Sequence, residues 1–526
     1  MVSNGVARSY DQQMEEEEPL LTSNKNGSED CFSQASLLMQ EEVTSRDASL
    51  SSDGDAEFGG PEARKALEKR LLLKLDLRMS ILIIIYILNY IDRNNASAAR
   101  LRGFERDLGL HGTEFATILS ILYVGYIIMQ VPSNMFLNYV GKPSIYLPIC
   151  MTIWGVISIL TGITHNFVGA LLTRFFLGFV EAAFFPGALF LLSKWYKRSE
   201  LSLRTAILSC GSLLSNAFGA LIASGILDTM EGKLGNAAWR WLFFIEGAMT
   251  VFVAICALFI LPDFPETSSN WLSPQEIALA KKRMTEDTGM EDQEDAHLLD
   301  SKDDNKGLLG FLSKESGLYL AFTDWKVWWM ALALTSMVVS LSFNAFFPTL
   351  SATMGFDRTR TLLLCAPPWI FATIVALFNS RHSDLTGERC WHIVVPLIVG
   401  LIGFVIAMST MNIAARYVSL FLMAQSYAGF ICFLAWISNT FARPPSKRAV
   451  ALALVNAFSQ LGNVAGSYVW PSGWGPTYRF SYAICISTNG LAIIMCFIFR
   501  QHLTFLNKRA AEKEEETGRR QFKYIL

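Results

Sequence analysis

Twelve apolar stretches of about 20 residues constrain this chain more than any other feature of its sequence. The hydrocarbon core of a bilayer is about 30 Å thick, which a helix of about 20 residues crosses. Because no water reaches that core, a crossing backbone must bond to itself, as it does in a helix. Only 17% of the residues are charged, against about 25% in soluble proteins. We therefore expect an all-α membrane protein. The stretches lie near 78–99, 114–136, 144–164, 167–192, 204–227, 239–261, 326–350, 360–380, 391–411, 416–441, 446–470 and 479–500.

A polar interval divides these stretches into two sets of six, the layout of transporters built from two repeated halves. Basic residues before the first stretch favour a cytoplasmic start, and an even number of crossings returns the chain to the same side. Within the polar interval, Ser273 followed by Glu276 is a capping pattern that predicts a surface helix near 273–284. The expected organisation is a cytoplasmic tail without stable structure (1–77), a six-helix half (78–261), a cytoplasmic linker (262–325), a second six-helix half (326–500) and a cytoplasmic tail (501–526).

Several function classes lack their sequence signals. The formal charge of −2 gives no basic field for nucleic acid. The nine cysteines are scattered without a C-x-x-C pattern, so we expect no metal site and no disulfide framework. There is no phosphate-binding loop and no set of nucleophile and base. We therefore expect no enzyme activity, no cofactor and no nucleic-acid partner.

Four ionisable side chains inside apolar stretches are the main functional candidates. Asp92 and Arg93 lie in the first stretch, while Arg174 and Glu181 lie seven residues apart on one face of the fourth. Charges inside a membrane are costly and point by default to function. A guanidinium fits a carboxylate, and a carboxyl in a low dielectric binds protons readily. The alternative is an ion pair that only joins two helices, but two acids and two arginines exceed one fixed pair.

Amide side chains on a later stretch are weaker candidates. Asn456, Gln460 and Asn463 fall at i, i+4 and i+7 and share one helix face. Such a face either lines a substrate cavity or joins helices through hydrogen bonds, and both remain open. A hydroxyl and amide face in the fifth stretch, formed by Ser209, Ser212 and Asn216, has the same two interpretations.

Asn344 lies among phenylalanines just before Pro348, where a helix break is expected. The aromatic rings there either suit a planar substrate or pack the core.

Four motifs lie in or beside the first set of stretches: LNYIDRNNASAAR at 88–100, RFFLGFVEAAFFPG at 174–187, WRWLFFIEG at 239–247 and LPDFPETSSNWLSPQEIALA at 261–280. Together they resemble the anion:cation symporter family of the major facilitator superfamily, over about 78–505. The fungal allantoate and nicotinate permease branch is the most similar. FFPTLSATMGF at 346–356 and CAPPWIFA at 365–372 favour its nicotinate side.

The resemblance implies the major facilitator fold, with twelve transmembrane helices in two six-helix halves. By the same resemblance, Asp92 and Glu181 are the proton carriers, and Arg93 and Arg174 are gate or carboxylate partners. Glu246, at the end of WRWLFFIEG, is interpreted as a helix-packing residue.

Two loops correspond to the superfamily's Gly-x-x-x-Asp-Arg-x-Gly-Arg pattern. Between the second and third stretches, NYVGKPS keeps only Gly141 and Lys142. Between the eighth and ninth, SRHSDLTGER keeps Asp384, Gly387 and Arg389. We therefore expect gating contacts in the second of these loops.

The expected function is secondary transport of a small organic anion, such as nicotinate or a related vitamin or metabolite, by proton symport with alternating access. Its partners would be the anion, protons and lipid, and we expect a monomer. Export of a carboxylated metabolite, drug–proton antiport and a non-transporting nutrient sensor are the alternatives. The plasma membrane is the expected location, while a dileucine sorting pattern, EEEPLL at 16–21, leaves a vacuolar or lysosome-like membrane open.

Overall fold

The computed structural model describes residues 58–265, 271–299, 317–441, 445–517 and 523–526. Within these residues the regular backbone is helical, without a strand. The dileucine pattern at 16–21 lies outside the described residues. The chain divides into two units, Met1–Arg70 and Leu71–Leu526. The described part of the first unit is mainly the beginning of one helix, which starts at Pro61.

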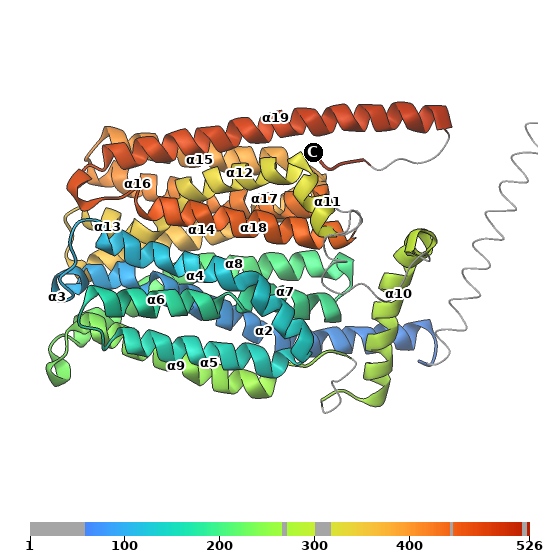
Figure 1. Cartoon of the computed structure of the whole chain (residues 1–526), viewed down its shortest axis with the longest axis horizontal. Coiled ribbons are helices and arrows are strands. Elements are labelled where there is room, and N and C mark those ends of the chain that lie inside the picture. Colours follow the sequence, from blue (N-terminus) through green and yellow to red (C-terminus); the bar gives the residue numbers. More distant parts are fainter. Residues whose placement is uncertain (1–57, 266–270, 300–316, 442–444, 518–522) are drawn as a thin grey trace, which may run out of the picture. The chain divides into compact units, whose positions relative to one another are not determined.

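Some of the first six membrane passages begin or end at residues with helix-capping chemistry, and Figure 1 labels the helices that form these passages. Asn166 caps α6 by accepting a hydrogen bond from the Gly169 amide. Gly141 ends α4 in a left-handed conformation, and Pro143 begins α5. The helices are α2 (Pro61–Arg100), α4 (Glu114–Val140), α5 (Pro143–Thr161), α6 (Phe167–Glu181) continued by α7 (Phe184–Trp195), α8 (Arg198–Thr229) and α9 (Ala238–Ile260), with α3 (Phe104–Asp107) joining the first two.

The second six passages include the break expected beside Pro348. There the helix narrows to a 3₁₀ segment at Leu341–Phe346 before it resumes. The helices are α12 (Trp325–Ser340) continued by α13 (Phe347–Ala352), α14 (Arg358–Thr386), α15 (Cys390–Ser409), α16 (Ile413–Ala424) continued by α17 (Tyr427–Thr440), α18 (Pro445–Ser467) and α19 (Arg479–Thr517).

The two sets share the same irregularities. α4 ends at Gly141 and α14 ends at Gly387, each glycine with a φ of 64°. The fourth passage of each set is interrupted, after Glu181 and after Ala424. Matching breaks at matching places are what two copies of one six-helix design predict. The predicted fold class, an all-α membrane protein of two six-helix halves, is confirmed.

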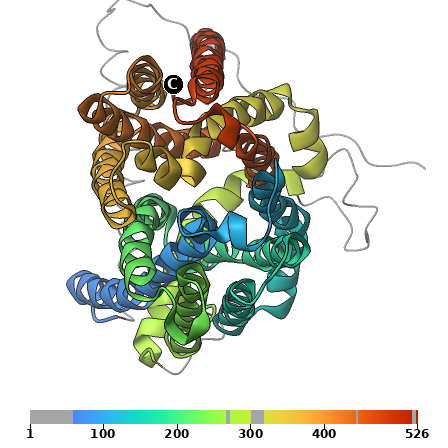
Figure 2. The same ribbon diagram turned by 90° about the vertical axis from the view of Figure 1, so that its left-hand side faces the viewer.

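Most packing lies within a half, and in the described residues two helix pairs make the most extensive contacts between the halves. In the first half α4 packs on α6 and α5 on α9; in the second, α12 packs on α18 and α15 on α19. Between the halves, α8 contacts α14 and α4 contacts α18. Figure 2, viewed along the helices, shows the blue-to-green half on one side and the yellow-to-red half on the other.

The α4–α6 contact depends on a glycine. A Cβ on Gly178 of α6 would overlap the main-chain carbonyl oxygen of Leu122 of α4. Small residues of this kind let membrane helices approach closely where no hydrophobic effect drives them together.

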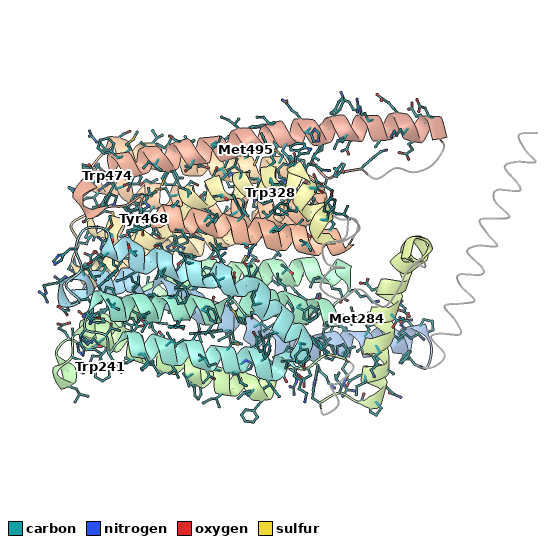
Figure 3. All side chains as sticks on the ribbon, viewed as in Figure 1. Trp241, Met284, Trp328, Tyr468, Trp474 and Met495 are labelled. Carbon is teal, nitrogen blue, oxygen red and sulfur yellow. The ribbon has the colours of Figure 1, made fainter. Side chains whose placement is uncertain are left out.

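The outer surface of the bundle suits lipid. Within the described residues, nine helical spans are long and apolar enough to cross a membrane. Phe252 and Phe378, on these spans, are 66% and 74% exposed. Figure 3 shows Trp241, Tyr468 and Trp474 toward one end of the bundle. Tryptophan and tyrosine are enriched where membrane proteins meet the membrane–water interface. We call this the aromatic end.

The polar interval contains α10 (Pro274–Leu299), which is longer than the helix expected at 273–284. Its predicted cap is present, because the Ser273 amide donates to Glu276 and the Glu276 amide donates to the Ser273 hydroxyl. Lys74 Nζ of α2 donates to Glu276 at 2.7 Å, and so holds α10 against the bundle. A short helix, α11 (Gly317–Thr323), precedes α12. α19 continues to Thr517, past residue 500, where the last passage was expected to end.

Candidate functional site

Arg93 and Glu181 form a buried ion pair between α2 and α6. Arg93 Nε donates to Glu181 Oε2 at 2.6 Å, and the side chains are 8% and 0% exposed. The rings of Tyr90 and Tyr126 lie against the guanidinium, with centroids 5.1 and 4.7 Å from Cζ. The other carboxylate oxygen of Glu181, Oε1, is buried without a hydrogen-bond partner. Glu181 is also the last residue of α6, so the pair lies at the break of the fourth passage.

Asp92 is held by hydroxyl groups rather than by a guanidinium. Ser158 of α5 donates to Oδ1, and Thr250 of α9 donates to Oδ2, both at 2.9 Å. The carboxyl is fully buried. The four charged groups predicted from the sequence therefore converge, but they contain one hydrogen-bonded arginine–acid pair, not two.

Arg174 binds the backbone of α2. Its Nη1 donates to the carbonyl oxygens of Asp92 at 2.9 Å and Arg93 at 3.3 Å, and its Nη2 donates to Asn95 Oδ1 at 2.6 Å. These bonds fix α2 at Asp92 and Arg93, its two residues in the buried charge cluster. The geometry favours a positioning role for Arg174 and leaves Arg93 as the arginine with an acidic partner.

A cavity between the halves brings several predicted residues together. Arg93 and Arg174 line it from the first half, and Asn344, Tyr427 and Asn463 line it from the second. Its volume is about 40 Å³, which leaves room for a few water molecules in this conformation. We call this space the arginine cavity.

Of the three predicted amide side chains on α18, Asn463 lines the arginine cavity. Its Nδ2 donates to Gln460 Oε1 at 2.9 Å, so Gln460 orients the amide that faces the cavity. Asn456 is half-buried one further turn along the helix. The cavity-lining interpretation therefore applies to Asn463 directly and to Gln460 through it.

The polar face of α8 joins helices and also meets a cavity. Asn94 Nδ2 of α2 donates to Asn216 Oδ1 at 2.8 Å. Ser209 and Ser212 donate to carbonyl oxygens of their own helix. Asn216 also lines a second cavity, described below.

The loop between α14 and α15 contains the predicted gating residues. Gly387 ends α14, and Arg389 Nη2 donates to Asp384 Oδ1 at 2.6 Å. Arg389 Nη1 also donates to Ser383 Oγ at 3.0 Å. The three residues kept from the superfamily pattern thus form one compact turn.

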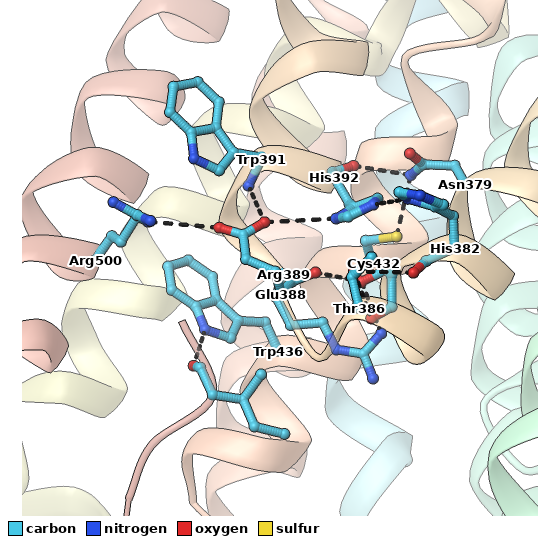
Figure 4. A network of polar contacts seen from close by, with 12 residues as sticks. Asn379, His382, Thr386, Glu388, Arg389, Trp391, His392, Cys432, Trp436 and Arg500 are labelled. Carbon is cyan, nitrogen blue, oxygen red and sulfur yellow. Dashed lines mark hydrogen bonds and ion pairs between the residues drawn. The ribbon is translucent and has the colours of Figure 1, made fainter. Parts of the chain in front are cut away.

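Figure 4 shows that this turn extends into a wider network. Arg500 of α19 and His392 of α15 both approach Glu388 to 3.5 Å. His382 Nδ1 lies 2.7 Å from His392 Nε2. The sequence assigned no role to these histidines, because nothing in a ten-residue spacing across a turn predicts that two rings will meet.

The last residues of the chain return to the same loop. The carbonyl oxygen of Ile525 accepts a hydrogen bond from Trp436 Nε1 at 3.0 Å (Figure 4). The carbonyl oxygen of Leu526 accepts from the amides of Arg389 and Cys390. Nothing in the sequence predicts this contact.

Hydrogen bonds between the halves gather at the aromatic end. Tyr468 Oη of α18 lies 3.1 Å from Thr117 Oγ1 and 3.3 Å from Ser120 Oγ of α4. Ser224 Oγ of α8 donates to the carbonyl oxygen of Thr359 at 3.2 Å. These bonds hold the two halves together at that end.

Three polar side chains, two buried and one half-buried, have positions that sequence reasoning missed. Tyr123 lines the arginine cavity, although one tyrosine among many aromatic residues carries no signal. Glu246 of α9 lines the second cavity, and Arg416 of α16 binds Thr353 Oγ1 at 2.7 Å. Glu246 and Arg416 carried the same signal as Asp92, a charge within an apolar stretch. In the part of the chain that the structure describes, no group of three or more His, Cys, Asp or Glu side chains could hold a metal ion.

Comparisons with known proteins agree on one family. The family model described as Major Facilitator Superfamily matches residues 82–467. The MFS-type transporter cnsO of Penicillium expansum is 31% identical over 463 residues, which cover 84% of this chain and 85% of the relative. A protein of Agrobacterium vitis named for tartrate transport is 30% identical, covering 76% of this chain and 87% of its own. A solved bacterial homologue of the human lysosomal transporter Spinster, inward-facing and unoccupied, shares the fold with a TM-score of 0.57 and 15% identity, over 81% of this chain and 95% of that one.

Proposed function

Because the chain belongs to the Major Facilitator Superfamily of membrane transporters, we propose that it carries a small organic anion together with protons by alternating access. Within the superfamily we place it in the anion:cation symporter family, beside the fungal allantoate and nicotinate permeases. The relative named for tartrate transport supports an organic acid as cargo.

The observation that carries the proposal is the position of Arg93. This arginine lines a cavity formed by both halves, and its charge is balanced by an acid, Glu181, rather than by solvent. A planar guanidinium with several donors can bind a carboxylate at two points. A carboxylate cargo would therefore compete with Glu181 for the same group.

The charges then explain the coupling. With Asp92 and Glu181 ionised and Arg93 and Arg174 charged, the four groups sum to zero. A bound monoanion that takes Arg93 leaves Glu181 without its partner in a low dielectric, where a proton is favoured. Protonated Glu181 restores a net charge of zero, and a neutral site crosses between the two states at the lowest cost.

Asp92 is the second proposed proton carrier. Its carboxylate accepts from Ser158 and Thr250, hydroxyls that can rotate. A proton on Asp92 would displace one of these donors, so its exchange would accompany a rearrangement among α2, α5 and α9. Arg174 would then hold α2 in place while the hydroxyls move.

Cargo selection would come from the second half. Asn344 and Asn463 offer amide groups to the cavity, with Gln460 behind Asn463 and Asn456 one turn further. The loop of Asp384, Gly387 and Arg389 would act as a gate. We propose uptake across the plasma membrane by a monomer with cytoplasmic termini; the dileucine pattern would be tested by replacing its two leucines with alanine and observing relocation.

Uptake into liposomes tests the function. Purified protein would be reconstituted with an acidic exterior and offered labelled nicotinate, pantothenate, allantoate, tartrate and glucose. We expect accumulation of at least one carboxylate, inhibited by competing carboxylates and abolished in Arg93→Gln. Transport of glucose that competing carboxylates leave untouched would overturn the proposal, and so would failure to move any of the acids.

A further inference from the structure

A second cavity adjoins the arginine cavity between the halves. Asn94, Ser97 and Asn344 line both cavities, so the two are neighbouring lobes of one central space. The second lobe is also lined by Glu246 and Trp369. Trp369 packs against Phe347, with ring centroids 5.0 Å apart, which gives this lobe an aromatic wall.

Glu246 faces this lobe with an unused oxygen. Its side chain is 1% exposed, and its Oε2 is buried without a hydrogen-bond partner. The charged groups around it are Asp92 of α2 and Arg174 of α6. The terminal nitrogens of Arg174 already bind two carbonyl oxygens and Asn95. Glu246 therefore has no guanidinium hydrogen-bonded to it.

Glu246 changes the charge of the site. With three acids and two arginines, the fully ionised cluster carries −1, so one proton makes it neutral before any cargo arrives. Glu181 has a hydrogen-bonded arginine, and Asp92 has two hydroxyl donors. Glu246 has only the Asn95 amide and the charge of Arg174, which is not hydrogen-bonded to it, to stabilise a negative charge, and a buried charge without a bonded ionic partner is costly. The proton belongs on Glu246.

We propose that Glu246 is a neutral carboxylic acid whose O–H donates a hydrogen bond to the cargo in the second lobe. This inference rests on the proposed function, since the arginine cavity would take the carboxylate end of the same cargo. The cargo would then carry an uncharged hydrogen-bond acceptor, such as a carbonyl, hydroxyl or ring nitrogen, at its other end. An ammonium group there is disfavoured, because a neutral acid does not balance it.

Infrared difference spectroscopy of the purified protein tests the proton without any transport. At neutral pH the wild type should show the carbonyl stretch of a protonated carboxylic acid. Glu246→Gln should lose that band, whereas Asp92→Asn and Glu181→Gln, measured in the empty carrier, should keep it. A wild-type spectrum without the band overturns the proposal even if the Gln variant does not fold, and so does a band that survives in Glu246→Gln.

The contact with cargo has its own readout. Binding of each candidate acid (nicotinate, pantothenate, allantoate and tartrate) is first detected as a rise in the melting temperature of the protein. An acid that binds should also shift the infrared carbonyl band of Glu246. A bound acid that leaves this band unshifted overturns the proposed contact. Glu246→Leu should weaken binding of that acid about tenfold, the equivalent of about 1.4 kcal/mol. Glu246→Gln should slow uptake severalfold yet keep the accumulation ratio, because this proton is not transported. Loss of the ratio would make Glu246 a coupling group and overturn the proposal. If no acid moves or binds, the function proposed above fails, while the band still decides the state of Glu246.

Discussion

Replacing Glu181 by glutamine removes the proposed coupling carboxyl but keeps the shape of the side chain and an oxygen that can accept from Arg93. In the wild type, the 2.6 Å bond joins two buried charges. Hydrogen bonds to charged groups contribute about 1.5–3 kcal/mol and neutral ones about 0.5–1.5 kcal/mol. The substitution should therefore weaken the resting pair by about 1 kcal/mol. Arg93 would become easier for an anion to reach, and binding should tighten by about fivefold.

The accumulation ratio should change far more than the affinity. One pH unit corresponds to about 1.36 kcal/mol for each proton. A symporter that moves one proton with one monoanion carries no net charge, so a gradient of about one unit should concentrate the anion about tenfold, independently of the membrane potential. Without the carboxyl at 181, anions should still exchange across the membrane, but the ratio should fall well below tenfold, toward one.

Liposomes with an imposed pH gradient give both quantities, from the initial rate of exchange and from the final ratio. Glu276→Gln makes the same chemical change in α10, outside the membrane passages, and should keep the tenfold ratio. Asp92→Asn tests the second proposed carrier in the same assay. Full accumulation by both Glu181→Gln and Asp92→Asn would refute the assignment of coupling to these two acids.

Gly178→Ala should lower the melting temperature, because the added Cβ would overlap a carbonyl oxygen of α4 and overpacking costs about 1–3 kcal/mol. Gly490→Ala, where the added Cβ would meet open space, is the matched control. Equal losses of melting temperature in both variants would contradict the close contact of α4 and α6. Tyr468→Phe removes the hydroxyl that joins the halves at the aromatic end, worth about 1 kcal/mol, so spin-label distances across that end should show more of the open state. An unchanged distance distribution would speak against a closing role. Burial raises the pKa of Glu276, but hydrogen bonds from Lys74 and Ser273, together with the positive charge of Lys74, outweigh it and hold the pKa below the ordinary value of 4.5. The bond from Lys74 is the one that joins α10 to α2. The bond from Lys74 to Glu276 therefore stabilises the docked α10 at higher pH and is lost as the pH falls through the lowered pKa of Glu276. Hydrogen exchange of the α10 amides should increase in acid. In Lys74→Met it should be increased already at neutral pH. Exchange in α10 that is insensitive to both changes would exclude this bond as its anchor.

The membrane passages could be predicted because length and hydropathy are properties of single segments. The convergence of Asp92, Arg93, Arg174 and Glu181 followed from charges that an apolar stretch does not otherwise tolerate. The sequence did not predict which acid pairs with which arginine, because consecutive side chains on a helix point about 100° apart. Arg93 consequently faces Glu181 and the cavity, while Asp92 turns toward α5 and α9.

The hydrogen-bond donors to Asp92 could not be predicted from the sequence either. Ser158 and Thr250 are ordinary small residues of membrane helices, and only the packing of three helices gives them a carboxylate to bind. Glu246 shows the opposite failure. Its charge was visible in the sequence, but its lining of a cavity depends on the second half of the protein.

The interruption after Glu181 allows α7 to bend relative to α6. Its 12 residues span about 18 Å, so a bend of about 10° at the break would move the far end, at Trp195, by about 3 Å. Glu181 lies at this break, and the gain or loss of a single proton there changes its contact with Arg93. The interruption between α16 and α17 gives the second half an arm of 14 residues, or about 21 Å. A change of ångström size at the centre of the membrane can thus become an opening the width of a water molecule at its surface.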